Sequence, residues 1–449
     1  MAKKKNKKTL LRVKHPDAAG IDIGSNEHWV AVGGDRTGQS IRSFGTFTSD
    51  LERLADWLKE CGVRTVAMES TGVYWIPVYE LLEERGFEVL LVNAAHARNV
   101  PGRKSDVLDC QWLQQLHTFG LVRASFRPAA RMAELRTYTR QRQTLIEDQA
   151  RQIQRIQKAL DQMNVQLHHV VSDITGKTGM TIVREIALGN HDPKQLAKYR
   201  DERCHASEAT ICQALQGHYK PEHLFTLKQS LKLFDSYGEH ILACDERIQA
   251  LLGELAAQGP EVASSPKPPK FRAKGRQIAI DVRNPLERIL GGVDVLSLVG
   301  IGPLTALNLF SETGKDMSRW PTEKHFTSWL NFAPGTHISG GRRLSSRRRP
   351  GRNRAGLVLR QAASSIGRTQ TALGAFYRRV AGRRGKAIAI VATARKLACA
   401  YYRLLRFGGP YIERGAAAAE HDYHQRRLNS LKRQAKILGY QLMPTQPEA

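Results

Sequence analysis

The 449-residue sequence lacks several features that would place it in other classes of protein. No apolar run reaches the roughly 18 residues that a membrane-spanning helix needs. The Lys-rich start, residues 1–14, is followed by no apolar segment of the kind that a secretory signal carries. The six cysteines are scattered without any Cys-x-x-Cys motif, so neither a disulfide framework nor a zinc site is expected. These absences predict a cytoplasmic protein with no membrane partner.

Acidic residues are missing from a long stretch near the C-terminus. Between Glu323 and Glu413 there are 19 lysines and arginines and no aspartate or glutamate. The whole chain has a formal net charge of +27, and this stretch carries most of it. A solvated surface normally mixes charges of both signs, so we interpret the stretch as one that contacts nucleic-acid phosphates.

The basic residues form separate groups. One group, the N-terminal lysines 3–8, is weaker evidence for nucleic-acid binding than the others, because short terminal lysine runs often only keep a chain soluble. The main group comprises Arg342, Arg343, Arg347, Arg348, Arg349, Arg352, Arg354 and Arg360. A second group comprises Arg378, Arg379, Arg383, Arg384 and Lys386.

Residues 18–128 have the pattern of an α/β domain. The expected order is three strands, helix, strand, helix, strand, helix, with Ser105 as a candidate N-cap of the last helix. The strands are expected at 18–24, 28–33, 41–47, 65–68 and 88–92, and the helices at 51–61, 73–85 and 105–117. In this order the first and fourth strands can be neighbours, and the last helix can cross their ends.

Four acidic residues stand out in this domain. Asp22 interrupts an apolar strand, and Glu69 follows the buried fourth strand directly. Asp106 and Asp109 lie three residues apart at the start of a helix and therefore share a face. Each has an ordinary alternative, such as a favourable charge at a helix N-terminus. Together, in an RNase H-like order of elements, they predict a site for two Mg²⁺ ions of the kind that supports phosphoryl transfer.

The rest of the chain is predicted to be mainly helical. Apolar residues at spacings of three, four and seven predict long helices at 132–164 and 224–255, which we interpret as an antiparallel coiled-coil arm. The alternative is that both helices pack in one core. Between them lies a helical insert, 165–221, to which the sequence assigns no role. Farther on, Gly300 and Gly302 are typical of a helix-hairpin-helix that binds phosphate through backbone N–H groups, although a plain helix–turn–helix connection fits as well.

The acidic motifs resemble those of a known family. Gly20-Ile21-Asp22-Ile23-Gly24, Met68-Glu69-Ser70-Thr71-Gly72-Val73-Tyr74-Trp75 and Lys104-Ser105-Asp106-Val107-Leu108-Asp109 resemble the DEDD transposases of insertion-sequence family one-hundred-ten, which includes the Piv/MooV-type DNA invertases. The resemblance implies a RuvC-like N-terminal domain. It also implies that Asp22, Glu69, Asp106 and Asp109 bind the catalytic metal.

The second half of the chain extends the resemblance. The matching motifs are Val299-Gly300-Ile301-Gly302-Pro303, Leu330-Asn331-Phe332-Ala333-Pro334-Gly335, Ser339-Gly340-Gly341, Gly351-Arg352-Asn353-Arg354 and Leu359-Arg360-Gln361-Ala362-Ala363. From the residues alone, Ser339 reads as a turn serine in a basic loop, whereas the resemblance places the family's catalytic serine there. The segment from Asn353 to Arg360 is longer than the compact family version, so Ser345 and Ser346 remain rival nucleophiles.

The resemblance implies a transposase that acts on donor and target DNA through a phosphoserine–DNA intermediate. It further implies a structured bridge RNA, a homodimer or tetramer, and a place at the bacterial nucleoid. The alternatives are a metal-dependent nuclease or Holliday-junction resolvase that uses water as nucleophile, and a non-catalytic packaging protein. The predicted domains are a basic arm (1–17), a RuvC-like domain (18–128), a helical dimerisation region (129–259), a linker (260–290), a C-terminal transposase domain (291–410) and a basic tail (411–449).

Overall fold

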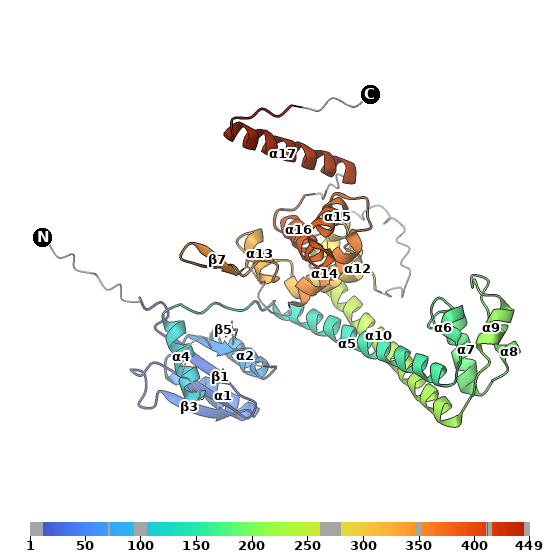
Figure 1. Ribbon diagram of the computed structural model, residues 1–449. Helices are drawn as coiled ribbons and strands as arrows, with labels where there is room; N and C mark the ends of the chain where they lie inside the picture. Colours follow the sequence, from blue (N-terminus) through green and yellow to red (C-terminus); the bar gives the residue numbers. More distant parts are fainter. Residues whose placement is uncertain are drawn as a thin grey trace. The chain divides into compact units, whose positions relative to one another are not determined.

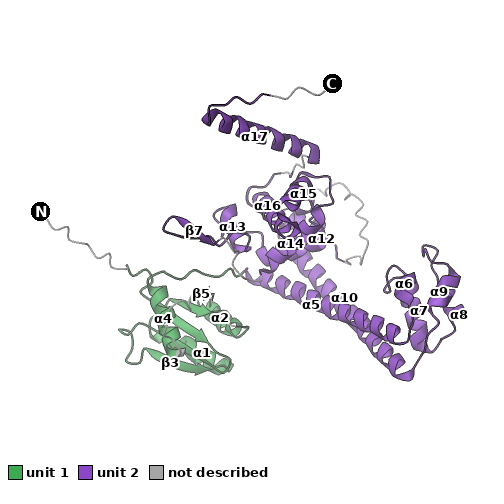
Figure 2. Cartoon of the chain, in the orientation of Figure 1, with its two compact units in different colours: residues 1–127 green, residues 128–449 purple. Residues whose placement is uncertain are grey.

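The computed structural model describes residues 12–70, 72–93, 106–260, 280–345, 353–409, 411 and 415–443. The chain forms two compact units, unit 1 up to Arg127 and unit 2 from Pro128 onward (Figure 2). Several residues discussed above lie outside the described ranges, namely the N-terminal lysines 3–8, Thr71, Ser105, Ser346, Arg347, Arg348, Arg349 and Arg352.

Unit 1 is built on a mixed five-stranded sheet with the strand order β3-β2-β1-β4-β5 (Figure 1). The first three strands form an antiparallel meander, whereas β4 and β5 run parallel to β1. The strands are β1 (Ala18–Ile23), β2 (Glu27–Ala31), β3 (Ile41–Gly45), β4 (Thr65–Glu69) and β5 (Glu88–Val92). The predicted order of strands and helices is confirmed, and it is consistent with an RNase H-like fold.

Helices cover both faces of this sheet. Alternate strand residues, such as Ile21 and Met68, are buried on one face against α1 (Thr48–Glu60) and α2 (Trp75–Glu84). Residues of the opposite parity, including Ala67, pack with Leu113 of α4 (Asp106–Thr118). Because successive side chains of a strand point to opposite faces, every other residue of β1 and β4 lies under α4.

A glycine in β1 lets α4 approach the sheet closely. A Cβ atom built on Gly20 would lie 2.3 Å from the backbone nitrogen of Gln114 and 2.4 Å from the carbonyl oxygen of Cys110. Real Cβ atoms do not approach backbone atoms so closely, so any other residue at this position would push α4 away. Gly20 therefore sets the distance between the helix and the ends of β1 and β4.

Unit 2 begins with an arm of two long antiparallel helices, α5 (Ala130–Gln162) and α10 (Pro221–Ala257). In the middle of the arm, Arg142 forms a buried ion pair with Asp245. Farther along α5, the Gln149 side chain donates a 2.9 Å hydrogen bond to the backbone carbonyl of Phe234. These two contacts involve a later residue of α5 and an earlier residue of α10 in turn. They confirm the predicted antiparallel pairing of the two long helices.

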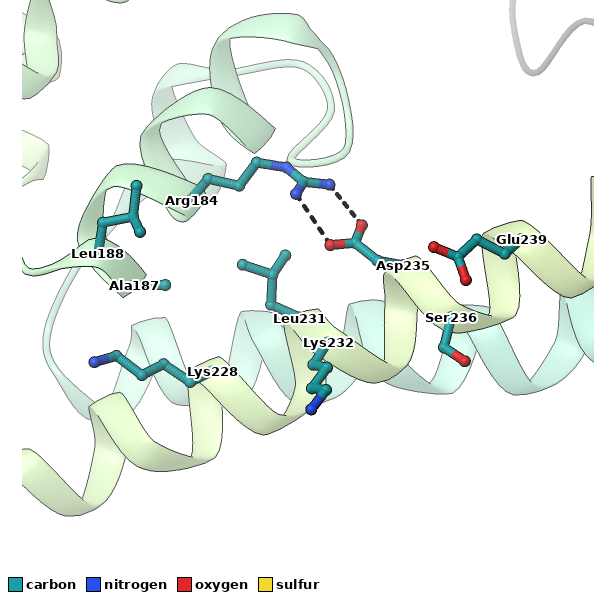
Figure 3. A pocket seen from close by; sticks show the side chains of 9 residues that line it. All are labelled: Arg184, Ala187, Leu188, Lys228, Leu231, Lys232, Asp235, Ser236 and Glu239. Atoms are coloured by element: carbon teal, nitrogen blue, oxygen red, sulfur yellow. Dashed lines mark hydrogen bonds and ion pairs between the residues drawn. The ribbon is translucent and has the colours of Figure 1, made fainter.

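The insert between the arm helices forms a small helical cap whose core is shared with the end of the arm. Buried residues such as Ile182 and Leu196 pack there against Leu160 and Leu227 of the arm. A surface groove of about 560 Å³ lies between α7 and α10, where the Arg184 guanidinium bridges to Asp235 by hydrogen bonds of 3.0 and 2.5 Å (Figure 3). The cap helices are α6 (Leu167–Val170), α7 (Lys177–Leu188), α8 (Pro193–Ala197) and α9 (Glu208–Ala214).

The C-terminal part of unit 2 is mostly helical, as predicted, around a core that includes Phe310, Phe326 and Tyr401. Its helices are α11 (Arg283–Ile289), the 3₁₀ turn η1 (Val295–Ser297), α12 (Pro303–Thr313), α13 (Glu323–Trp329), α14 (Arg354–Ile366), α15 (Ala372–Arg384), α16 (Lys386–Phe407) and α17 (Gly415–Ile437). One hairpin, β6 (His337–Ser339) and β7 (Arg342–Ser345), interrupts them. None of the described helices is both long and apolar enough to cross a membrane.

The segment expected as a linker, 260–290, contains ordered structure at its end. The Asp281 backbone N–H donates a 2.7 Å hydrogen bond to the Gln249 side chain in α10. A Cβ atom on Gly259 would lie 2.5 Å from the Arg288 carbonyl oxygen, so α11 packs directly on the end of the arm. Residues 261–279 lie outside the described part of the chain.

Candidate active site

Asp22 and Glu69 lie near the C-terminal ends of two neighbouring parallel strands. The register of β1 and β4 pairs Gly20 with Ala67 and Ile21 with Met68. Continuing it by one residue places Asp22 beside Glu69, with both side chains on the same face of the sheet. Asp22 is half-buried and Glu69 is only 8% exposed. Two carboxylates held side by side at the ends of neighbouring strands present oxygen ligands to a cation, which makes this edge of the sheet a candidate site.

The face that carries both acids is the face covered by α4. Asp22 is two residues from Gly20, over which α4 passes, so both residues share that face. Burial raises the pKa of the Cys110 thiol in α4 to about 12, and the negative charge of Asp22 contributes to the shift. Cys110, one turn into α4, therefore lies within electrostatic range of the Asp22 carboxylate.

The first turn of α4 also contains the other two predicted acids. Asp106 is the first residue of the helix, and Asp109 is exposed one turn later. Asp109 also contributes to raising the pKa of Cys110, although less than Asp22 does. The fold of unit 1 thus brings Asp22, Glu69 and the helix turn of Asp106 and Asp109 to one edge of the sheet.

The donor set at this edge fits a hard divalent cation. Carboxylate oxygens are the ligands that Mg²⁺ prefers, and the sheet supplies two of them at the same level. Among the described side chains, which do not include that of Asp106, no group of three or more His, Cys, Asp or Glu is arranged to hold a metal ion. Completion of a metal shell would therefore depend on Asp106 and on oxygens from substrate or water.

The motif that follows Glu69 forms a tight turn into α2. Ser70 continues the sheet, since its backbone N–H donates a 3.0 Å hydrogen bond to the Val92 carbonyl. Gly72 adopts a positive φ of 56°, which favours glycine. The turn leaves Val73 66% and Tyr74 47% exposed, two large side chains close in sequence to the candidate acid.

Arg127, at the end of unit 1, packs on α2, the helix that follows this turn. Its guanidinium lies 3.8 Å from the ring centroid of Tyr79 and 5.7 Å from that of Trp75. It also forms ion pairs with Glu80 at 3.1 Å and Glu83 at 3.6 Å. No local sequence pattern marks Arg127, because its partners lie more than 40 residues away along the chain.

Ser339 lies at the tip of the short hairpin in unit 2, and not in an irregular loop. It is the last residue of β6 and pairs with Arg342, the first residue of β7. The two residues between them, Gly340 and Gly341, have φ values of 55° and 75°. Two consecutive positive φ angles define the two-residue turn preferred in tight hairpins, where glycine avoids the strain of a side chain. The Gly-Gly pair was the sequence signal for this hairpin.

The hairpin carries its functional groups on exposed positions. Ser339, Arg342 and Arg343 are all exposed, whereas the rival Ser345 is half-buried at the end of β7. The acids belong to unit 1 and Ser339 belongs to unit 2, so the fold of each unit determines only its own set.

Asn353 fixes the point at which the chain returns from the basic segment to α14. Its side-chain oxygen accepts a 2.9 Å hydrogen bond from the Gly356 N–H, and its amide donates a 3.0 Å bond to the Trp329 carbonyl. A Cβ atom on Gly356 would lie 2.6 Å from the Leu330 carbonyl oxygen. Asn353 therefore caps one helix and ties it to another, while the next residue, Arg354, is exposed.

The two glycines of the predicted phosphate motif have different environments. Gly300 has a φ of 81°, and a Cβ atom there would lie 2.7 Å from the Ile366 side chain of α14. Gly302 is the N-cap of α12, and a Cβ atom there would meet nothing within 4 Å. Gly300 thus has a packing role, whereas Gly302 leaves the start of a helix open to approach. The helix-hairpin-helix stays a prediction.

An ion-pair cluster that the sequence did not signal joins the arm to the C-terminal helices. Arg140 of α5 donates two 2.8 Å hydrogen bonds to the Glu312 carboxylate in α12. Arg136, one turn earlier, donates a 2.8 Å bond to the Glu312 backbone carbonyl, and burial lowers its pKa to about 10. No local pattern could reveal these contacts, because the partners lie some 170 residues apart.

Comparison with known protein families finds matches in two separate stretches of the chain. The DEDD domain model of IS110 transposases, described as a transposase, matches residues 19–165. A second model, described as the transposase IS116/IS110/IS902 family, matches residues 294–378. No curated protein matches the sequence significantly. The two matches contain the acids and Ser339 respectively, and they occur in the order that the family resemblance predicts. The chain belongs to the IS110 family of transposases, enzymes that act on DNA.

Proposed function

We propose that this transposase cuts and rejoins DNA at a site that combines the acids of unit 1 with Ser339 of unit 2. The observation that supports the proposal is the placement of Asp22 beside Glu69 on the sheet face that α4 covers. We propose that this edge gathers oxygen ligands from β1, β4 and α4, which are far apart in the sequence.

We assign Asp22, Glu69, Asp106 and Asp109 to the binding of two Mg²⁺ ions. When bound, such ions would polarise a phosphodiester and neutralise charge that develops on its oxygens. The half-buried Asp22 and the buried Glu69 would form the fixed part of the site, because strands hold them in register. The exposed Asp109 would supply the outer part.

We assign the nucleophile to the Ser339 hydroxyl. Its oxygen would bond to phosphorus, the bond from phosphorus to one deoxyribose oxygen would break, and the serine proton would leave as the departing oxygen gains one. The product is a phosphoserine linked to one DNA end, and the reverse step on another end would exchange strands. A serine hydroxyl is a weak nucleophile. The exposed Arg342 and Arg343 beside it would stabilise the additional negative charge on the phosphate.

The remaining parts of the chain would organise the nucleic acids and the assembly. We propose that the α5–α10 arm is a coiled coil that forms a homodimer, that two dimers can pair, and that the acids of one protomer meet Ser339 of another. The main basic group would contact DNA and a bridge RNA, with base pairing providing the sequence specificity, and Gly302 would admit a phosphate at the start of α12. Such a protein would work at the bacterial nucleoid in the cytoplasm.

Recovery of the covalent intermediate tests the mechanism. The protein is purified from cells that contain its element, the bound DNA is digested, and peptides are searched by mass spectrometry for a nucleotide attached to serine. We expect the adduct on Ser339, its loss in Ser339→Ala, and its persistence in the matched control Ser345→Ala. Asp22→Asn and Glu69→Gln should abolish strand cleavage while nucleic acid is still retained on a filter.

Three results would contradict these assignments. Cleavage by Ser339→Ala at the normal rate would indicate that water attacks, as in a metal-dependent nuclease or junction resolvase. An adduct on Ser345 or Ser346 would assign the nucleophile to that serine instead of Ser339. Unchanged activity in Asp22→Asn and Glu69→Gln would instead remove the acids from the reaction.

A further inference from the structure

The second basic group of the sequence lies on α15, apart from Lys386, which begins α16, and it is away from the Ser339 hairpin in the chain. Cations of three helices converge there. The Arg379 guanidinium of α15 lies 3.9 Å from the ring centroid of Tyr423 in α17, and Arg383 donates a 2.7 Å hydrogen bond to the Tyr423 hydroxyl. These contacts attach α17 to α15.

A lysine of α16 completes the cluster. The Lys396 ammonium lies 4.1 Å from the ring centroid of Phe376 in α15. Lys396 is exposed as a residue, but partial desolvation of its ammonium lowers its pKa, and the positive charges of Arg379 and Arg426 lower it further. The lysine is therefore close to cations of both neighbouring helices. We call Arg379, Arg383, Lys396 and Arg426 the α15–α17 cluster.

Few carboxylates balance this cluster. Among the described residues, no ion pair includes Arg379, Arg383 or Lys396. Arg426 has a distant partner, Asp422, one turn earlier in α17 at 3.9 Å. Positive charges held together in this way repel one another, so a polyanion that replaces the missing counter-charges would bind here favourably.

The aromatic rings in the cluster indicate which form of nucleic acid fits. Unpaired bases of single strands and RNA loops bind by stacking on free aromatic faces. Here one face of Tyr423 is covered by Arg379 and one face of Phe376 by Lys396, so neither of these faces is open to a base. Charges that occupy the aromatic faces beside them suit the regularly spaced phosphates of a duplex. We infer that the α15–α17 cluster is a second DNA-binding site, which holds the phosphate backbone of duplex DNA outside the segment that the hairpin engages.

The site adds a contact to the proposed function and rests on it only in taking DNA as the substrate. It lies mostly beyond residue 378, where the second family match ends. We therefore expect the α15–α17 cluster to add to the affinity for duplex DNA of any sequence, from a part of the chain that the family match does not include.

Salt dependence of binding tests the site directly. Affinity for a duplex of arbitrary sequence is measured without Mg²⁺ by fluorescence anisotropy over a series of NaCl concentrations. For Arg383→Gln, Lys396→Gln and Arg426→Gln combined, the slope of log K against log salt should become shallower by roughly 1 per lost phosphate contact, up to about 3. The charge-conserving triple Arg383→Lys, Lys396→Arg and Arg426→Lys should keep the original slope.

A matched control removes three arginines elsewhere. Arg53, Arg64 and Arg85 of unit 1 each form an ion pair with an aspartate, so their change to glutamine should leave the slope unaltered. The single variants Lys396→Gln and Arg426→Gln, at exposed positions, repeat the test without disturbing the bonds to Tyr423, with an expected change of about 1 each.

The inference is overturned if the slope for duplex DNA is unchanged in the triple and both single variants. The inference is also overturned if only RNA binding changes, because the cluster would then bind the proposed bridge RNA and not duplex DNA. The serine adduct is measured separately in the same variants. Loss of the adduct in Ser339→Ala without any change in salt slope would leave this site intact, so the two proposals fail by different measurements.

Discussion

Arg140 of α5 and Glu312 of α12 are joined by two parallel hydrogen bonds of 2.8 Å each. The Glu312 side chain is only 10% exposed and also lies 3.3 Å from the Arg136 guanidinium. One acid therefore holds two cations at the junction between the arm and the C-terminal helices. Arginine can make such a bidentate bond because its guanidinium is planar and presents donors in a fixed fork.

Removal of this acid should destabilise unit 2. Glu312→Ala leaves the largely buried Arg136 without its counter-charge, at a cost of about 3 kcal/mol in the free energy of unfolding. Urea denaturation followed by circular dichroism measures the change. The control Glu134→Ala removes an acid from a solvent-exposed pair with Arg131 and should have no measurable effect. Equal stability of the two variants would show that the buried cluster contributes nothing.

The distance between α4 and the sheet should be sensitive to one methyl group. Gly20→Ala would place a Cβ atom against backbone atoms of α4, and we expect a loss of about 1–3 kcal/mol together with loss of DNA cleavage. The control Gly38→Ala adds a methyl group in open space and should leave both unchanged. Thermal unfolding and a plasmid-nicking assay check the two effects. Full cleavage by a folded Gly20→Ala protein would separate the packing of α4 from the site.

The hairpin turn offers a test that does not alter the proposed nucleophile. Gly340→Ala and Gly341→Ala should each strain a positive φ by roughly 1 kcal/mol, which shifts Ser339 without unfolding unit 2. Asparagine tolerates this conformation better, so Gly340→Asn should recover much of the adduct yield. The adduct assay measures all three variants. Alanine variants with normal yield would show that the hairpin geometry does not position the reacting serine.

The stability of unit 1 should fall in mild acid because of His117. This side chain is fully buried, bonds to the Thr65 hydroxyl at 2.9 Å, and has a pKa lowered to about 4 by burial and by nearby His15. In the unfolded chain its pKa is near 6.5, so below that pH the unfolded state binds the extra proton. Stability is therefore complete above pH 6.5 and declines as the pH falls toward 4, by up to roughly 3 kcal/mol.

Unfolding curves at neutral pH and at pH values inside this window measure the effect. His117→Gln can keep a hydrogen bond to Thr65 but cannot titrate, so it should reduce the dependence on pH. A smaller dependence should remain, because burial also lowers the pKa of His28. The exposed His240→Gln serves as the control and should leave the curve unchanged. An equally steep decline in His117→Gln would assign the acid sensitivity to other groups.

The sequence predicted those features that depend on local periodicity. The strands around Asp22 and Glu69 and the order of helices in unit 1 followed from short apolar runs and turn residues. The two arm helices followed from apolar spacing. The adjacency of Asp22 and Glu69 required only the strand order, and the register is consistent with it. The roles of the acids and of Ser339 stay predictions.

Features that depend on distant contacts were not predictable. Three examples are the Glu312 cluster, the packing of Arg127 on α2 and the attachment of Tyr423 to α15. Each joins residues that share no sequence pattern. The Ser339 hairpin is a different case, because Gly340 and Gly341 form a recognised turn signal in the sequence. The basic residues around them favoured the interpretation as a loop. Asn353 likewise reads as part of a basic loop, whereas its capping bonds depend on the position of Trp329.

The buried pair of Arg142 and Asp245 has a consequence for the arm as a whole. A purely apolar seam between two helices tolerates sliding by one repeat, since one leucine resembles the next. A charge in the seam tolerates no such shift, because any other offset would leave both ions facing hydrocarbon. The pair therefore fixes the register of the two arm helices. We expect the helical cap to be held at one fixed distance from the C-terminal helices at the other end of the arm.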